Sequence, residues 1–159
     1  MKTLAPGFTL IELIVTIGVL SILLGASVAF LNPPLLLAKA RDSKRLSDLS
    51  VLSAAVEHYI IDIGSPPGSE NMHLSDFLPE GQEGPLQSAS KGWIDANMNK
   101  YIRNLFTDPK NEGDFVYRYI HNGRSYEFDG AMEVNFDKHL SDNGDDENRY
   151  EVGSDLSLL

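Results

Sequence analysis

Two groups of residues have side chains whose types and spacing suggest chemistry. One is a lone carboxylate, Glu12, inside a long apolar segment, and the other is the acidic run Asp142-Asn143-Gly144-Asp145-Asp146-Glu147. A carboxylate at membrane depth costs on the order of 2.5–3.5 kcal/mol by insertion scales, so Glu12 is a functional candidate that needs a cationic partner. The acidic run supplies the hard oxygen ligands that calcium prefers.

The acidic run does not have the ligand spacing of an EF-hand loop. Because the same residues also build ordinary exposed turns, an acidic surface loop is the simpler interpretation of these residues taken alone. If a metal does bind, the side-chain candidates are Asp142, Asp145 and Asp146.

Most other site chemistry finds no support in the sequence. The chain has no cysteine, which excludes a disulfide framework, a thiolate metal site and a cysteine nucleophile. No nucleophile motif, Walker loop or dinucleotide-binding fingerprint occurs. The four histidines, at positions 58, 73, 121 and 139, lack metal-ligand spacing. We therefore expect a protein that is not an enzyme and requires no cofactor.

Length and charge divide the chain into two unlike parts. Its 159 residues allow one domain with an appendage. Apart from Lys2 and Glu12, every Lys, Arg, Asp and Glu lies from Lys39 onward, so the net charge of −10 belongs to residues 39–159. An acidic domain of this kind disfavours direct binding to the phosphate backbone of nucleic acids.

The segment Phe8 to Leu31 is long and apolar enough to cross a membrane. It holds 17 apolar residues in 24, and as a helix it would measure about 36 Å, against a hydrocarbon core of about 30 Å. A removable secretory signal is one alternative, because Ser27-Val28-Ala29 resembles a small-residue cleavage site. Cleavage after Ala29 would release a soluble domain with calcium as its candidate ligand. A second alternative is a single-pass membrane protein that never polymerises.

The leader Met1-Lys2-Thr3-Leu4-Ala5-Pro6-Gly7, followed at once by Phe8-Thr9-Leu10-Ile11-Glu12, makes the prediction more specific. This pattern resembles the class III signal of type IV pilins and of the major and other pseudopilins of type II secretion. The resemblance implies cleavage by a prepilin peptidase between Gly7 and Phe8, N-methylation of the Phe8 amine, and a role for Glu12 in the register of filament assembly. A helix would place Phe8 and Glu12, four residues apart, on one face.

The same resemblance implies an α+β pilin fold, with a long N-terminal helical spine packed on a small antiparallel sheet. It implies storage in the bacterial inner membrane with the head exported, followed by assembly into a periplasmic or cell-surface filament. The expected partners are other copies of the chain, other pilin-like subunits, the peptidase and an inner-membrane assembly platform. It also places one Ca²⁺ in a C-terminal loop, where the acidic run lies.

Hydrophobic spacing predicts that the spine continues beyond the membrane segment. Pro33-Pro34 predicts a kink near Asn32, and apolar residues at steps of three or four predict an amphipathic second half over 32–64. Within the first half, Gly18, Ser21 and Gly25 share a face where neighbouring helices could approach closely, although small residues are common in membrane helices.

Lys39, Arg41, Lys44 and Arg45 form a basic cluster near the start of that second half. The positive-inside rule alone would place this side of the segment in the cytoplasm, but a leader that the peptidase recognises must itself face the cytoplasm. The cluster is interpreted either as a solvated helix face or as a set of salt bridges to the acidic heads of neighbouring subunits.

Residues 65–159 are predicted to form the globular head. Pro and Gly residues indicate a variable loop over 65–109, with a short helix near Trp93 to Leu105. Alternating aromatic residues on both sides of Asn122-Gly123 predict a β-hairpin over 114–134 with a type I′ turn. The acidic C-terminal loop spans 137–159.

Overall fold

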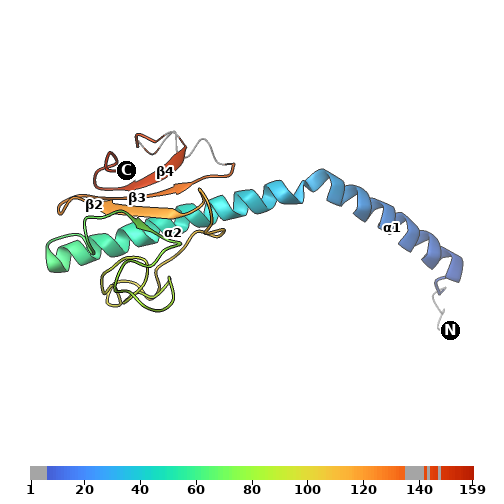
Figure 1. Ribbon diagram of the computed structural model, residues 1–159. Coiled ribbons are helices and arrows are strands. Elements are labelled where there is room, and N and C mark those ends of the chain that lie inside the picture. The colour runs from blue at the N-terminus through green and yellow to red at the C-terminus, as the bar shows by residue number, and fades with distance from the viewer. Residues whose placement is uncertain (1–6, 135–141, 143, 147) are drawn as a thin grey trace, which may run out of the picture. The chain divides into compact units, whose positions relative to one another are not determined.

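The computed structural model describes residues 7–134, 142, 144–146 and 148–159. It contains two helices and a four-stranded antiparallel sheet, which is the α+β arrangement of a pilin fold (Figure 1). The chain divides into two compact units, Met1–Leu37 and Ala38–Leu159, and each is described by itself.

Helix α1, Leu10–Leu31, is the apolar helix that the sequence predicts. Thr9 caps its start, because the Thr9 Oγ1 accepts a hydrogen bond from the Glu12 backbone N–H at 3.3 Å. Hydroxyl groups inside the helix donate to backbone carbonyls one turn earlier, from Ser21 to Ile17 and from Ser27 to Leu23. Such local bonds satisfy polar groups in a segment that meets no water in a bilayer.

The break between the two halves of the spine falls at Asn32, as the sequence predicts. Asn32 ends α1 in a left-handed conformation, with φ 43° and ψ 68°. Helix α2, Pro33–Ile63, then begins on Pro33, whose missing N–H needs no partner at a helix start.

The sheet has the strand order β1-β2-β3-β4, with every neighbouring pair antiparallel. Its central strands are β2, Tyr117–His121, and β3, Tyr126–Ala131, and its edges are β1, His73–Leu74, and β4, Arg149–Gly153. The hairpin is therefore confirmed, but the two edge strands were not expected. Strand β1 has only two residues, too few to show alternation. Strand β4 has the alternating sequence Arg-Tyr-Glu-Val, but it follows an acidic run that was interpreted as a loop.

The hairpin turn differs from the predicted type I′. Four residues, 122–125, join β2 to β3, and Asn122 does not adopt the positive φ that a type I′ turn requires. Instead, the Asn122 side-chain oxygen accepts hydrogen bonds from the backbone N–H groups of Arg124 and Ser125 at 3.1 and 2.9 Å. This local side-chain bonding favours a longer turn.

One hydrophobic core joins α2 to the sheet. Leu49, Leu52 and Val56 of α2 are at most 1% exposed, and they pack with aromatic side chains of β2 and β3 and with residues of the connecting loop, namely Trp93, Ile94, Leu105, Tyr117, Tyr119, Tyr126 and Phe128. The expected aromatic face over the helix is present.

The short helix expected near Trp93 to Leu105 does not form. The backbone N–H groups of Trp93, Met98 and Leu105 donate to carbonyls in the preceding loop, those of Leu86, Ala89 and Gln87 respectively. These long-range bonds replace a helical ladder, and the apolar residues that suggested helical spacing serve the core instead.

Candidate functional site

The N-terminal signal residues lie at the exposed start of α1. Gly7 and Phe8 precede the helix in non-helical backbone, and Phe8 is 79% exposed. Glu12 lies in the first turn, where the helix dipole favours an acid. Because Thr9 is the cap and the helix begins at Leu10, Phe8 and Glu12 do not share a helical face in this structure, contrary to the spacing argument from sequence.

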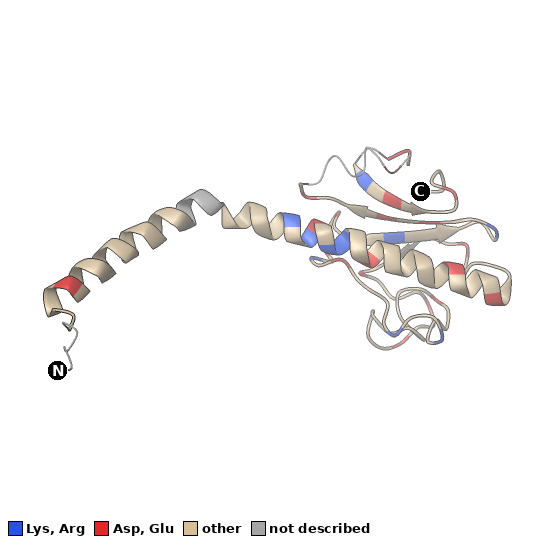
Figure 2. Cartoon of the chain, turned by 180° about the vertical axis from the view of Figure 1, so that it is seen from behind, with Lys and Arg blue, Asp and Glu red and all other residues tan. Residues whose placement is uncertain are grey.

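Helix α1 offers an uncovered apolar surface around this carboxylate. All described side chains from Leu10 to Ser27 are exposed, and this stretch is long and apolar enough to cross a membrane. The helix contains one acidic and no basic residue, and the next charged residues along the chain lie in α2 (Figure 2). Gly18 and Gly25 have no neighbouring atoms against them, so the predicted small-residue face is open.

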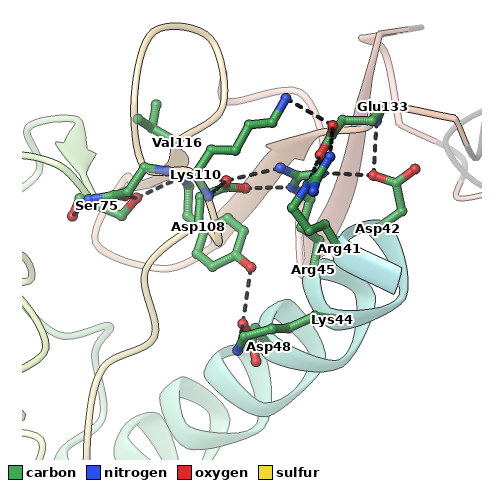
Figure 3. A network of polar contacts seen from close by, with 12 residues as sticks. Arg41, Asp42, Lys44, Arg45, Asp48, Ser75, Asp108, Lys110, Val116 and Glu133 are labelled. Atoms are coloured by element: carbon green, nitrogen blue, oxygen red, sulfur yellow. Dashed lines mark hydrogen bonds and ion pairs between the residues drawn. The ribbon is translucent and has the colours of Figure 1, made fainter. Parts of the chain in front are cut away.

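Arg45, one residue of the basic cluster of α2, lies at the centre of a buried ionic network within its own head (Figure 3). Arg45 is 0% exposed. Its guanidinium donates to Asp108 at 2.5 and 3.0 Å, to Asp42 at 2.8 Å and to Glu133 at 2.8 Å. Arg41 adds a bidentate pair to Glu133 at 2.6 and 2.7 Å.

This network corrects both interpretations made from sequence for Arg45 alone, because Lys39 and Lys44 are exposed. Arg45 is neither solvated nor available to a neighbouring subunit, and Lys44 pairs with Asp48 on its own helix at 2.7 Å. Burial by itself lowers the pKa of Arg45, but the hydrogen bonds that it donates to Asp108 and Glu133 outweigh burial and raise the pKa above its ordinary value. The hydrogen bond from Arg41 lowers the pKa of Glu133 well below its usual range. Arg45 and Glu133 therefore stay ionised.

A second carboxylate group lies where β3 and β4 meet the C-terminal loop. One oxygen each from Glu127, Asp145 and Glu151 lie within 4.8 Å of one another. Glu127 and Glu151 are 0% and 2% exposed, and the Oε1 atom of each has no hydrogen-bond partner among the described residues. Two buried carboxylates this close cannot both be ionised without a cation between them or beside them.

The sequence-predicted calcium ligands divide between two roles. Asp145 belongs to this carboxylate group. Asp142 instead accepts hydrogen bonds from the backbone N–H groups of Gly144 and Glu151, at 3.0 and 2.9 Å. Asp146 accepts from the Asn148 N–H at 2.9 Å. These two aspartates hold the loop, and the assignment of calcium to the three residues stays a prediction.

Sequence reasoning missed Glu127 and Glu151. Alternation in the hairpin puts Glu127 opposite the aromatic face, which in an isolated hairpin is the solvent side. Here the C-terminal residues cover that side, and the Glu127 Oε2 accepts hydrogen bonds from the backbone N–H groups of Leu158 and Leu159 at 2.7 and 3.1 Å. The signal was the density of acids on one strand face, where Arg118 and Arg149 pair with Asp129 and not with Glu127.

Three oxygen ligands fit the start of a calcium site. Calcium takes six to eight oxygens, which include backbone carbonyls and water. When no cation is present, a proton can neutralise the pair instead: burial, followed by the nearby Glu127 carboxyl, raises the pKa of Glu151 to about 8. Burial also raises the pKa of Glu127. The group can therefore hold either a proton or a divalent cation.

Comparison with known proteins identifies the N-terminal segment. Residues 5–28 match the family model described as the prokaryotic N-terminal methylation motif, which is the prepilin signal of type IV pilins and pseudopilins. No curated protein and no solved structure matches the chain. The matched stretch contains Gly7, Phe8 and Glu12.

We predict that Arg45→Ala strongly destabilises the head. Removing the guanidinium leaves three carboxylates around a buried site without their shared cation, and breaking a buried pair typically costs about 3–5 kcal/mol. Urea unfolding of the full chain in detergent micelles, followed by near-ultraviolet circular dichroism, measures this loss. The control is Lys100→Ala, which removes a surface pair with Asp62 and should cost less than about 1 kcal/mol. Equal losses in the two variants would refute the structural role of Arg45.

We also predict that, in the presence of a chelator, the head loses stability as pH rises from about 4.5 to 8. The Glu151 carboxyl has a pKa of about 8 in the folded state and 4.5 ordinarily, so the folded state binds the proton more tightly and gains from it most below pH 4.5. Ionisation through pH 8 removes that gain, on the order of 5 kcal/mol. Thermal melting across this range measures it, and Glu151→Gln should flatten the profile. A wild-type profile already flat between pH 5 and 8.5 would contradict the prediction.

Proposed function

We propose that this chain, a type IV pilin-like precursor by its N-terminal signal, is a structural subunit that polymerises into a filament. The filament is of the type IV pilus or type II secretion pseudopilus kind, and the subunit waits for assembly in the membrane. The observation that carries the proposal is the prepilin signal at residues 5–28, which extends into an apolar helix with a single carboxylate and with all described side chains exposed. The role is structural and not enzymatic.

The apolar surface of α1 needs a cover at each stage of this pathway. Exposed apolar side chains such as Ile11, Ile22 and Leu24, which are 67–74% exposed in the isolated chain, are unfavourable in water and favour burial in lipid or against other helices. Lipid supplies that cover in the bacterial inner membrane, with the head exported. Helices of other subunits supply it in the filament, through contacts of the head-to-tail kind that do not close into a ring.

Glu12 would fix the register of neighbouring helices, whose apolar surfaces alone would not. After cleavage before Phe8, the new α-amino group is a cation close to the start of α1, and a neighbouring subunit can place its own amine against the Glu12 carboxylate. A paired carboxylate in an apolar environment is far less costly than an unpaired one. Only a correctly staggered neighbour satisfies the pair, so the proposed partners are other copies and other pilin-like subunits.

Processing distinguishes this proposal from its main competitor, a soluble domain secreted after cleavage at Ala29. We expect the intact mass of the membrane-extracted chain to correspond to a start at N-methylated Phe8 when a prepilin peptidase is co-expressed, and to the unprocessed chain when it is not. A soluble product beginning at Phe30 would establish the competitor and remove the filament proposal.

We predict that Glu12→Ala abolishes filament assembly and leaves the head folded. The variant removes the one acid of α1, so nothing in the helix penalises a wrong stagger. Filaments are counted by electron microscopy after co-expression with the assembly machinery, and the near-ultraviolet circular dichroism of the head reports folding. Glu83→Ala, an exposed acid in the head, serves as the control. Normal filaments from Glu12→Ala would exclude the register role.

We further propose that the carboxylate group of Glu127, Asp145 and Glu151 binds one Ca²⁺ that stabilises the head. The buried, unpartnered oxygens of the two glutamates support it. Calcium would neutralise carboxylates from two strands and from the C-terminal loop at one point. This contribution is structural and not catalytic.

Calcium at about 1 mM should raise the melting temperature of the full chain, and more at pH 8 than at pH 5, because protons compete for the same carboxylates. Asp145→Asn should remove most of the increase. Asp146→Asn should retain the increase, because Asp146 is a ligand suggested by sequence that lies outside the carboxylate group of Glu127, Asp145 and Glu151. A melting temperature indifferent to calcium and chelator at both pH values would overturn the proposal.

A further inference from the structure

A pocket that belongs to neither site lies beside strand β1. Its volume is about 390 Å³, and its lining includes Ser69, Met72, His73, Phe77, Glu80 and Asp95. The lining comes from residues 69–80, which include β1, and from the loop near residue 95. The pocket therefore lies between two parts of the loop segment 65–109. The resemblance at the N-terminus predicts nothing for either part.

One wall of the pocket is held firmly to the sheet. The backbone carbonyls of the three consecutive residues 67–69 each form a hydrogen bond with a side chain of β1 or β2. In chain order, their partners are the Tyr119 hydroxyl at 2.9 Å, the His121 Nε2 at 3.1 Å and the His73 Nε2 at 3.1 Å. A wall fixed in this way loses little conformational freedom when a ligand binds.

Asp95 provides a carboxylate oxygen at this wall. Its Oδ1 accepts a hydrogen bond from the Ser69 N–H at 2.8 Å and lies 3.3 Å from the His73 Nε2. Its Oδ2 forms no hydrogen bond with the described part of the chain, and the side chain is 23% exposed. One oxygen therefore orients the carboxylate while the other stays available as an acceptor.

The charge around the pocket is of one sign. Residues 65–90 contain four acidic residues and no Lys or Arg, and none of the four forms an ion pair with another described residue; they are Glu70, Asp76, Glu80 and Glu83. Acids without internal partners create a negative potential that attracts cations. Glu80 contributes to it directly, since it lines the pocket.

The rim of the pocket is apolar and exposed. Among the described residues from 65 onward, Met72 and Phe77 are the large hydrophobic side chains that face solvent, 51% and 67% exposed. Both line this pocket. Exposed aromatic and methionine side chains gathered at one place are typical of a protein-binding surface.

We propose that this pocket binds a Lys or Arg side chain, flanked by an apolar residue, on a separate partner protein. The aliphatic stem of such a side chain would lie along Met72 and Phe77, and its cation would reach the carboxylates of Asp95 and Glu80. A second copy of this chain is a poorer occupant. Its head carries the net charge of −10 and spends many of its own cations, such as Arg41, Arg45 and Arg149, on internal ion pairs.

The test uses the full chain, labelled with ¹⁵N, in detergent micelles and the peptide acetyl-Gly-Ser-Leu-Lys-Ser-Gly-amide. Titration should shift backbone amide signals of residues 69–80 and Asp95. Binding should weaken at least about fivefold for Phe77→Ala and for Glu80→Gln, and it should weaken as salt is raised. Both changed side chains are exposed, so the fold should survive. Glu83→Gln and Ile61→Ala change an acid and an apolar residue outside the pocket and should bind like the wild type.

The peptide with Glu in place of Lys, and the one with Ser in place of Leu, test the two parts of the ligand and should bind at least about fivefold more weakly. The proposal is overturned if the Lys and Glu peptides bind equally, if the shifts lie elsewhere, or if no shift appears up to millimolar peptide. It is also overturned if the chain associates with itself without peptide and Glu80→Gln abolishes that association, since the occupant is then a second copy.

Discussion

The fold of the head depends on the neutralisation of the buried charge of Arg45. A fully buried guanidinium is tolerated only when carboxylates surround it. Its partners come from three separate stretches of the chain: Asp42 one turn away on α2, Asp108 at the end of the long loop, and Glu133 just past β3. Asp42 also accepts hydrogen bonds from the Glu133 and Val134 backbone N–H groups, where β3 has ended. One buried cation thus fixes the helix, the loop and the sheet to each other at one end of the core.

The other face of the sheet carries buried charge of the opposite sign. The face of β3 turned away from α2 presents Glu127 and Asp129, both fully buried. Arg118 and Arg149 neutralise Asp129, whereas no basic side chain pairs with Glu127 in the described residues. The two buried acids of one strand therefore have unlike surroundings. That contrast, more than the number of acids in the loop, is what distinguishes a metal or proton site from ordinary surface charge.

Sequence predicted the features that depend on neighbours along the chain. The apolar span, the break at Asn32 and the paired aromatic strands all follow from local patterns, and the structure confirms them. Features that depend on distant partners were missed. Nothing near Arg45 in sequence shows that Asp108 and Glu133 will enclose it, and nothing near Trp93 shows that its backbone will bond to Leu86 instead of continuing a helix. Glu127 was overlooked because its burial depends on the last residues of the chain. Gly7, Phe8 and Glu12 could be singled out from sequence because they lie in a contiguous motif, and their roles stay predictions.

The hydroxyl groups of α1 have a mechanical consequence. Thr16, Ser21 and Ser27 each donate to a carbonyl of their own helix, so these hydroxyl protons are already used and are not donated to a neighbouring helix. Contacts between such surfaces are set by shape and dispersion, which change gradually as one rod slides or turns against another. If copies of α1 pack together as proposed, the helices should slide and turn against one another under load without breaking hydrogen bonds, and only the charged group at one end would favour a single alignment.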